Sequence, residues 1–297
     1  MKTVNLCGVE IAVVSRDSFA DFVIDRLKGS GGCAVCKVNT EFLARSISDK
    51  AFQKALNDSA LNIADGRGVL WAARYLTISS KPLATSYKLL RAAEAVWQMI
   101  YSGAAVVFNP KYISGPISEN IPGVDALKLM LKAAEETRSG VFFFGATQTD
   151  LDGAIGNIQK EMPKLIVDGS LNGYDFQNDK SIDPVDIINK TDAKLLIVAL
   201  GSPMQEYWVR DNLPNLKNVR VAVGEGGSLA FLSGTFKRAP KWVQEAGLEW
   251  LWRLFMNKSL THQTGSRLQR VWNAVPIFIY EVVKWKIKNG AIDVEDN

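Results

Sequence analysis

The chain has 297 residues and a formal net charge of +4; 47% of its residues are hydrophobic and 22% are charged. This composition is typical of a globular protein with a large core, and it excludes an extensively disordered chain. The small net charge argues against a nucleic-acid partner, and the single histidine, His262, argues against a histidine-based triad or a multi-histidine zinc site.

The first part of the chain predicts a hairpin followed by alternating helices and strands. Residues 4–15 alternate in polarity around Gly8, as a short hairpin does. The elements expected next are a helix at 16–28, a strand at 33–39, helical segments at about 40–58, a strand at 60–64 and a helix at 67–76. Because the N-terminus itself has a strand pattern, we do not expect a secretory signal there.

Two of the three cysteines, Cys33 and Cys36, have CxxC spacing within the second predicted strand. No second cysteine pair or neighbouring histidine completes a metal site around them. We therefore predict that both are core or edge-strand residues rather than metal ligands.

The second half of the chain repeats short apolar runs between helices. The strands expected there are 141–145, 164–169, 195–201 and 219–224, and the helices are about 150–161, 183–190 and 203–212. Such a rhythm indicates a parallel sheet covered on both faces. The predicted fold class is α/β, with a Rossmann-like, mostly parallel sheet, helices on both faces, a helical insertion and a basic C-terminal helical appendage.

Two segments interrupt this rhythm and define the expected domains. An α/β domain at 1–240 carries an apolar helical insertion at 81–116, and an appendage at 241–297 mixes tryptophans with lysines and arginines. The insertion fits docking on a membrane or partner as well as internal packing. For the appendage a membrane surface is favoured over a helical subdomain packed on the core. No apolar run approaches the roughly 20 residues that span a bilayer, so we expect a cytoplasmic chain, peripheral on the inner face of the membrane.

Asp65 ends the predicted strand at 60–64 and precedes two glycines, Gly66 and Gly68, at the start of a helix. Ligands of open α/β sheets bind beyond the carboxyl ends of the strands, where a lone carboxylate beside helix N–H groups suits a general base next to an anion site. The alternative is that Asp65 caps the helix that follows.

Two other strand ends carry residues of the same kind. Gly201 opens a turn with Gln205 one helical turn later, and Gly226 and Gly227 follow the strand at 219–224. Glycines allow a close approach of the backbone to a ligand, and exposed N–H groups at a helix start hold phosphate. Three such strand ends on one sheet edge favour the general-base interpretation of Asp65 over the cap.

Several other patterns are weaker or absent. The DxD of Asp150 and Asp152 has the spelling of a metal site, but its place at a predicted helix start favours capping. No Gly-x-Gly-x-x-Gly follows a strand, and neither a Walker A sequence nor a Gly-x-Ser-x-Gly elbow is present.

The ordered motifs together resemble the WecG/TagA/CpsF glycosyltransferase family. They are NTEF at 39–42, ADGRGV at 64–69, NGY at 172–174, GSPMQE at 201–206, KRAPKW at 237–242 and GLEWLWRL at 247–254. The resemblance covers roughly residues 4–255, apart from 81–116.

The resemblance implies an inverting transfer of a sugar from a UDP-linked donor to a membrane-bound polyprenyl-diphosphate sugar, in cell-surface polysaccharide synthesis. The donor sugar would be of the N-acetylmannosamine type, its uronate or glucose. The reaction would need no cofactor and no metal ion. The partners implied are these two substrates and a membrane surface, with a homo-oligomer left open.

The resemblance also implies roles for individual residues. Asp65 would be the general base, with Asn39 beside it as the second catalytic residue. The residues that would bind the substrates are Thr40, Gly66, Arg67, Gly173, Tyr174, Gly201, Gln205, Gly226, Gly227, Arg238 and Arg253. Arg267 and Arg270 would add to the basic grip of the appendage on the lipid diphosphate and membrane.

Two positions depart from the family pattern. Asn120 stands where the family commonly has an arginine that helps with the diphosphate, and Ala230 stands where it commonly has an aspartate. Losing such an arginine could cost about 3 kcal/mol of transition-state stabilisation, unless Arg67 or a C-terminal arginine replaces it. These departures support an alternative function, a catalytically weak or inactive membrane-bound assembly protein on the same fold. A nucleotide-dependent oxidoreductase is a third and weaker hypothesis.

Overall fold

A computed structural model of the chain describes residues 1–79, 88–117, 119–179, 181–235, 239–240, 243, 264–292 and 294–295. Within these ranges the backbone alone is described for residues 107, 110, 174, 177, 264–274 and 294–295. The residues at 236–238 and 244–263, which include the predicted ligands Arg238 and Arg253, lie outside the described residues.

The centre of the molecule is a six-stranded sheet in which every neighbouring pair is parallel. Its order across the sheet is β4 (Leu61–Ala64), β3 (Cys33–Val38), β8 (Val221–Gly224), β7 (Leu195–Ala199), β5 (Val141–Gly145) and β6 (Val167–Leu171). The four strands β3, β5, β7 and β8 are rich in Val, Ile, Leu and Phe and are buried almost throughout, as strands covered on both faces are.

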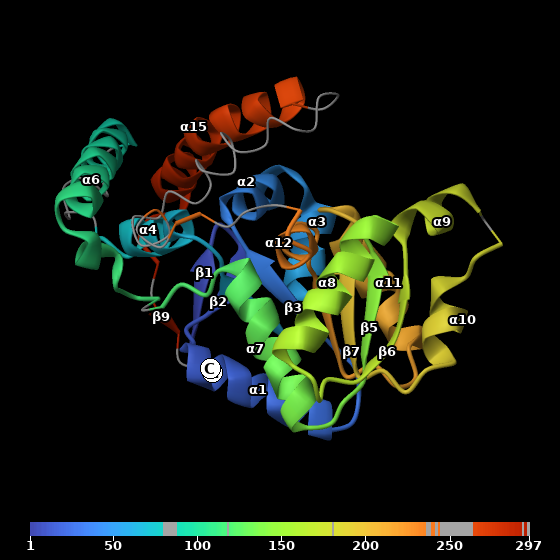
Figure 1. The fold of residues 1–297 in the computed structure, drawn as a ribbon. Coiled ribbons are helices and arrows are strands. Elements are labelled where there is room, and N and C mark those ends of the chain that lie inside the picture. The colour runs from blue at the N-terminus through green and yellow to red at the C-terminus, as the bar shows by residue number, and fades with distance from the viewer. Residues whose placement is uncertain are drawn as a thin grey trace.

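Helices cover both faces of this sheet, so the predicted α/β architecture is confirmed (Figure 1). One face packs against α1 (Arg16–Lys28), α7 (Gly123–Glu136), α8 (Gln148–Glu161) and α12 (Ser228–Leu232). The other packs against α2 (Thr40–Ser48), α3 (Lys50–Asn57), α4 (Arg67–Leu76), α10 (Pro184–Asn189) and α11 (Met204–Asn212). A short α9 (Gly173–Asn178) follows β6, and η2 (Leu213–Asn215) follows α11.

The predicted N-terminal hairpin is also confirmed. β1 (Thr3–Leu6) pairs antiparallel with β2 (Val9–Ala12) across a turn that contains Gly8, and β9 (Val294–Glu295) pairs with the other side of β1. The C-terminal residues therefore return to the first strand of the chain.

The predicted insertion contains a long helix, α6 (Lys88–Phe108), followed by the short η1 (Pro110–Ile113). α6 packs on α4 and on α15 (Thr264–Asn289), and α15 also crosses α2 (Figure 1). Lys286 of α15 is buried and donates a hydrogen bond to the carbonyl of Tyr75 in α4. No described helix has both the length and the apolar character needed to cross a bilayer.

One predicted strand is shifted. The apolar run suggested a strand at 164–169, whereas β6 occupies Val167–Leu171. β6 is an edge strand that pairs only with β5 and is half-exposed, so the position of its hydrogen-bonded ladder does not follow the apolar run. Ile166, which belongs to that run, is 44% exposed.

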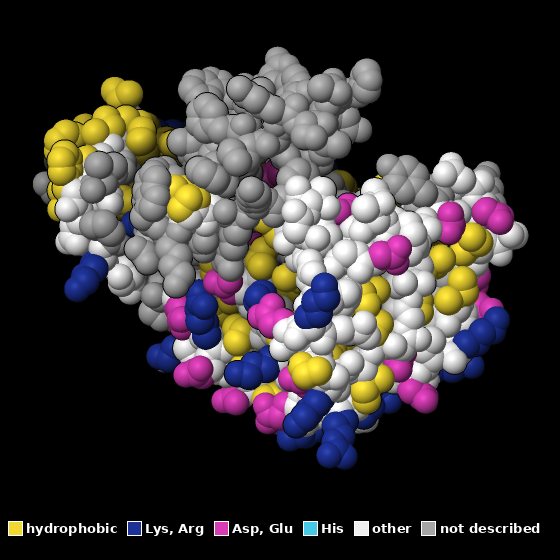
Figure 2. Space-filling view, in the orientation of Figure 1, with side chains coloured by type: hydrophobic (Ala, Val, Ile, Leu, Met, Phe, Trp, Pro, Cys, Tyr) yellow, Lys and Arg dark blue, Asp and Glu magenta, His cyan; other side chains and the backbone are white. Residues whose placement is uncertain are grey.

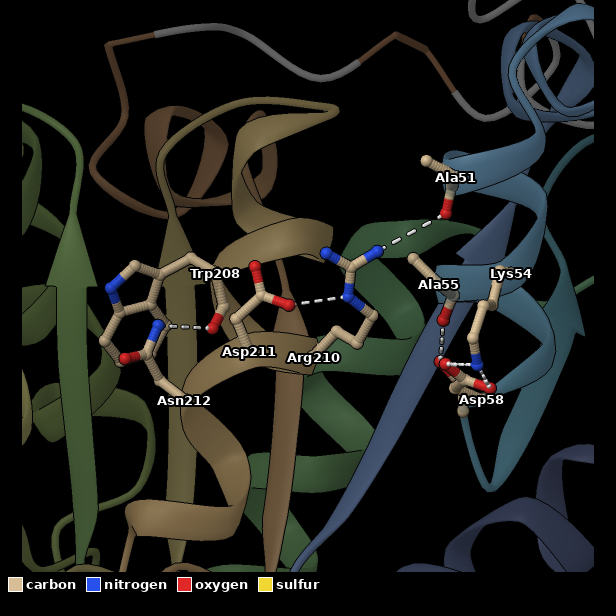
Figure 3. A network of polar contacts seen from close by, with 9 residues as sticks. Ala51, Lys54, Ala55, Asp58, Trp208, Arg210, Asp211 and Asn212 are labelled. Carbon is tan, nitrogen blue, oxygen red and sulfur yellow. Dashed lines mark hydrogen bonds and ion pairs between the residues drawn. The ribbon is translucent and has the colours of Figure 1, made fainter.

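The two cysteines of the CxxC lie on β3 and are buried free thiols, as predicted. Burial raises the pKa of Cys36 to about 12, which makes it a poor metal ligand near neutral pH. Beside Cys36, residues near the end of α3 and along α11 line a hollow of about 220 Å³. Figure 3 shows Arg210 of α11 reaching across to the carbonyl oxygen of Ala51 on α3.

Candidate active site

Asp65 and Asn39 lie side by side at the carboxyl edge of the sheet. Val38 and Ala64 are register partners on β3 and β4, so Asn39 and Asp65 are the next residues on two neighbouring strands. The Asp65 amide donates to the carbonyl of Val38 at 2.9 Å, which ties the two strand ends together. The structure thus brings together the two residues predicted to be catalytic.

Asp65 does not cap its own helix. The N-cap of α4 is Gly66, whose φ of +105° lies outside the range that most side chains tolerate, and no side chain caps this end. The Asp65 carboxylate instead accepts a hydrogen bond from the Gly123 amide, at 3.3 Å, in the first turn of α7. The alternative interpretation of Asp65 as the cap of the helix that follows is therefore wrong.

Asn120 holds the turn that presents Asp65. Its Oδ1 accepts a hydrogen bond from the Gly66 amide at 2.6 Å. Because Gly66 directly follows Asp65, this bond fixes the chain direction between β4 and α4. Asn120 therefore has a structural role in this turn.

Asn39 and Thr40 begin α2 and bring it against α4. The Asn39 Oδ1 accepts from the Phe42 amide at 3.0 Å, an N-cap bond, so this oxygen is already engaged. The Thr40 side chain lies where a Cβ on Gly68 would stand, so only a glycine at position 68 allows this approach of the two helices. Arg67 is half-buried in the first turn of α4.

The turn after β7 meets the turn after β8. Gln205 is buried, and its Nε2 donates to Glu206 Oε1 at 2.7 Å. Its Oε1 has no hydrogen-bond partner among the described residues and lies 2.9 Å from the position that a Cβ would take on Gly226. Gly201 has a φ of +80°, and its Cα is 3.0 Å from the same position. An unpaired buried amide oxygen beside two bare glycines is an arrangement suited to a polar ligand.

The remaining predicted ligands divide into three groups. Gly227 is the N-cap of α12, next to Gly226. Gly173 is buried at the start of α9 and donates from its amide to Ala146 at 3.0 Å, near the end of β5. For Tyr174 only the backbone in α9 is described, while Arg238 and Arg253 are outside the described residues.

Two charged residues at this edge were not predicted as site residues. Lys37 on β3 and Glu225 just after β8 form a buried ion pair, with side chains 8% and 0% exposed. Burial raises the pKa of Glu225, and the nearby Lys37 opposes that rise. A lysine inside an otherwise apolar strand was the only signal in the sequence.

Glu206 is a third buried charged residue here, after Lys37 and Glu225. Burial raises its pKa, while hydrogen bonds from Gln205 and Ser202 lower it. Lys37 contributes a weaker lowering effect, which places Glu206 in the field of the same ammonium group.

Asp150 and Asp152 have hydrogen-bond partners within the chain. Thr147 caps α8, and Asp150 in the first turn accepts hydrogen bonds from Ser233 and Thr235. Asp152 accepts from Gln148 at 2.7 Å. Within the described ranges, no group of three or more His, Cys, Asp or Glu side chains could hold a metal ion.

Comparison with known proteins identifies the family of this chain. The model of the glycosyl transferase WecG/TagA/CpsF family matches residues 4–95 and 83–291. This chain belongs to that family. The overlap of the two matched segments at 83–95 falls at the start of the insertion.

The curated relatives are named N-acetylglucosaminyldiphosphoundecaprenol N-acetyl-β-D-mannosaminyltransferase. The one from Bacillus subtilis (strain 168) is 31% identical over 155 residues, which are 52% of this chain and 59% of that protein. The one from Staphylococcus aureus (strain MW2) is 28% identical over 190 residues, 64% of this chain and 70% of that protein. The match to the Bacillus subtilis relative thus spans about three fifths of that protein's length.

Proposed function

We propose that this protein is an inverting glycosyltransferase that moves a sugar from a UDP-sugar to a polyprenyl-diphosphate-linked acceptor in cell-envelope polysaccharide synthesis. The observation that carries the proposal is the placement of Asp65 beside Asn39 at the carboxyl edge of the sheet. Asp65 does not serve there as the N-cap of α4. The relatives' printed name supports an N-acetylmannosamine-type donor and an N-acetylglucosaminyl-diphospho-undecaprenol acceptor.

Asp65 would act as the general base. Its carboxylate takes the proton of the acceptor hydroxyl while that oxygen attacks the anomeric carbon of the donor. The bond from this carbon to the UDP oxygen breaks, so UDP leaves from the opposite face and the configuration inverts. The positive end of the α11 helix dipole suits the departing diphosphate, with Arg238 and Arg253 as the proposed cations.

The donor pocket would lie around Gln205, Gly201, Gly226 and Gly173. The free Oε1 of Gln205 can accept a hydrogen bond from a nucleotide or sugar. A Cβ on Gly201 would meet nothing within 4 Å, so a ligand can approach the backbone there, whereas the space beside Gly226 holds Gln205 Oε1 and the Gly201 Cα.

The test is transfer from a panel of UDP-sugars to a short polyprenyl-diphosphate N-acetylglucosamine. We expect transfer by the wild type, a loss of at least 100-fold in kcat for Asp65→Asn, and unchanged UDP affinity by calorimetry in that variant. Asp58→Asn, which changes an exposed carboxylate at the C-cap of α3, is the matched control and should keep full activity.

The alternative, a catalytically inactive assembly protein, makes a different prediction. It is favoured by Ala230 and by the use of Asn120 in a structural hydrogen bond instead of at a phosphate. Absence of transfer from every donor, together with absence of UDP binding, would refute the glycosyltransferase proposal and support this alternative.

We further propose that the protein is peripheral on the inner face of the membrane and contacts it through α6. The outward residues of α6 are apolar, with Leu89, Trp97 and Phe108 exposed by 82%, 66% and 88%. Figure 2 shows these hydrophobic side chains gathered over α6. Two exposed lysines flank this apolar surface, Lys88 at the start of α6 and Lys111 just after its end. Their positive charges suit anionic lipid headgroups.

This contact predicts pelleting with vesicles that contain phosphatidylglycerol and weaker pelleting with phosphatidylcholine alone. Trp97→Glu combined with Ile100→Glu should reduce pelleting at least tenfold, because two charges would enter the apolar interface. Ile166→Glu is the control, since Ile166 is an exposed apolar residue beside β6. Unchanged pelleting in the double variant, or a wild-type dimer that this variant dissociates, would refute the membrane contact of α6.

A further inference from the structure

The Lys37–Glu225 pair follows from the strand register. Val35 on β3 is the partner of Val223 on β8, so Lys37 and Glu225, two residues further along each strand, come opposite one another. Side chains two apart in a strand share a face. Lys37 and Glu225 therefore lie on the face that packs against α7 and α12, where Val35 and Val223 are part of the core.

Asp65 lies on the same face of the neighbouring strand. Ile63 is the register partner of Lys37 and belongs to the same core, and Asp65 comes two residues later. A Cβ built on Gly123 would be 3.1 Å from Lys37 Nζ, 3.4 Å from Asp65 Oδ2 and 3.5 Å from Ser228 Oγ. The ammonium group of Lys37 is thus in contact with the carboxylate of Glu225 and close to that of Asp65. Gly123, which has no side chain, lies beside both Lys37 and Asp65.

The charges around Asp65 come from several elements. Lys37 comes from β3 and Glu225 from the end of β8, Arg67 lies two residues after Asp65 in the first turn of α4, and Glu206 of α11 lies in the field of Lys37. The amino end of α7 adds the Gly123 N–H. Burial is the largest cause of the raised pKa of Glu225, and the negative charge of Asp65 adds a smaller rise.

We propose that Lys37 is a positioning residue for Asp65: its buried ammonium, anchored by Glu225, keeps the Asp65 carboxylate ionised and directed to the sheet edge. This inference rests on the proposed function, in which Asp65 is the general base. Glu225 has a second effect, because its charge offsets that of Lys37 and so preserves the basicity of Asp65.

The two members of the pair should have opposite effects on the ionisation of Asp65. Removal of a cation at this range favours the protonated carboxyl group, whereas removal of an anion favours the carboxylate. A residue that served only packing would not produce shifts of opposite sign.

The test is the pH dependence of kcat in four variants of the full chain. Lys37→Met should move the acidic limb up by about one pH unit, and Glu225→Gln should move it down by a similar amount. Lys37→Arg, which keeps a cation, should restore most of the wild-type profile. Lys128→Met removes the lysine of an exposed ion pair between α7 and α8 and should leave the profile unchanged.

A second readout does not require transfer. Carboxyl-carbon NMR of the wild type and of Lys37→Met gives the titration midpoint of Asp65 directly, and the variant's midpoint should be higher. If Lys37→Met does not fold, Lys37→Met combined with Glu225→Met removes both buried charges at once and serves as the folded comparison.

The outcomes separate the two proposals. A folded Lys37→Met with an unmoved midpoint and an unmoved kcat profile overturns the positioning role, whatever the activity. A moved midpoint in a protein without transfer activity supports the Lys37–Asp65 coupling and refutes the proposed function instead.

Discussion

Replacement of Gly123 by alanine would separate stability from activity in this protein. Gly123 is the first residue of α7, and its φ is not in the left-handed region, so alanine fits the backbone. Alanine is the better helix former by about 1 kcal/mol in a helix interior. At a first turn the benefit is smaller, and we expect the free energy of unfolding to change by less than about 1 kcal/mol.

The added methyl group would disturb the polar cluster. It would lie 3.1 Å from Lys37 Nζ, which is buried and already in contact with Glu225, so Lys37 cannot simply turn away. The carboxylate of Asp65, 3.4 Å away, and the Gly123 amide that binds it must then shift by a few tenths of an ångström. Since a 1 Å misplacement costs about 100-fold in rate, we expect kcat to fall roughly 3- to 10-fold.

The assays are urea unfolding and sugar transfer, with Gly156→Ala as the matched control. Gly156 lies inside α8, and a Cβ there would meet nothing within 4 Å. That control should be about 0.5–1 kcal/mol more stable than wild type and equally active. A Gly123→Ala protein with wild-type kcat would show that the cluster tolerates displacement and would refute this reasoning.

Two other variants test single contacts. Burial lowers the pKa of Lys286 from 10.5 to about 8. Below pH 8 the buried ammonium is charged and lowers the free energy of unfolding by its full amount. As the pH rises from 8 toward 10.5 the folded protein loses this proton, and the destabilisation decreases. Wild type should therefore gain about 2 kcal/mol over Lys286→Met between pH 7 and pH 9.5; equal pH dependence in urea titrations would contradict this. Asn120→Ala leaves the Gly66 amide without its acceptor and should lose about 1–2 kcal/mol, measurable in the same titrations, where an unchanged midpoint would show that water replaces Asn120.

The parallel sheet was predictable because its strands are buried on both faces. The runs at β5 and β7 are continuous in apolar residues, and their positions were predicted to within two residues. The position of β6 was not predicted to this accuracy. This edge strand contains the polar residues Asp168 and Ser170, and backbone pairing with β5 rather than burial determines where it lies.

The candidate site was predictable only where a local motif marks it. Asp65, Gly201 and Gly226 stand at strand ends, and that position is readable from the sequence. The Lys37–Glu225 pair was not readable, because its members are 188 positions apart and only the β3–β8 register joins them. The contact between Asp65 and Gly123 was missed because it joins residues 58 positions apart, and only the packing of α7 beside the end of β4 brings them together.

The strand order has a consequence for how this chain is synthesised. β3 and β4 are made early, yet the other neighbour of β3 is β8, which is made almost 190 residues later. Until β8 emerges, one edge of β3 lacks its partner strand, which is the kind of edge that invites misassembly. Lys37 lies on that edge, and Glu225 arrives together with β8. Burial of the Lys37 charge therefore accompanies the pairing of β8 with β3 during the folding of this protein.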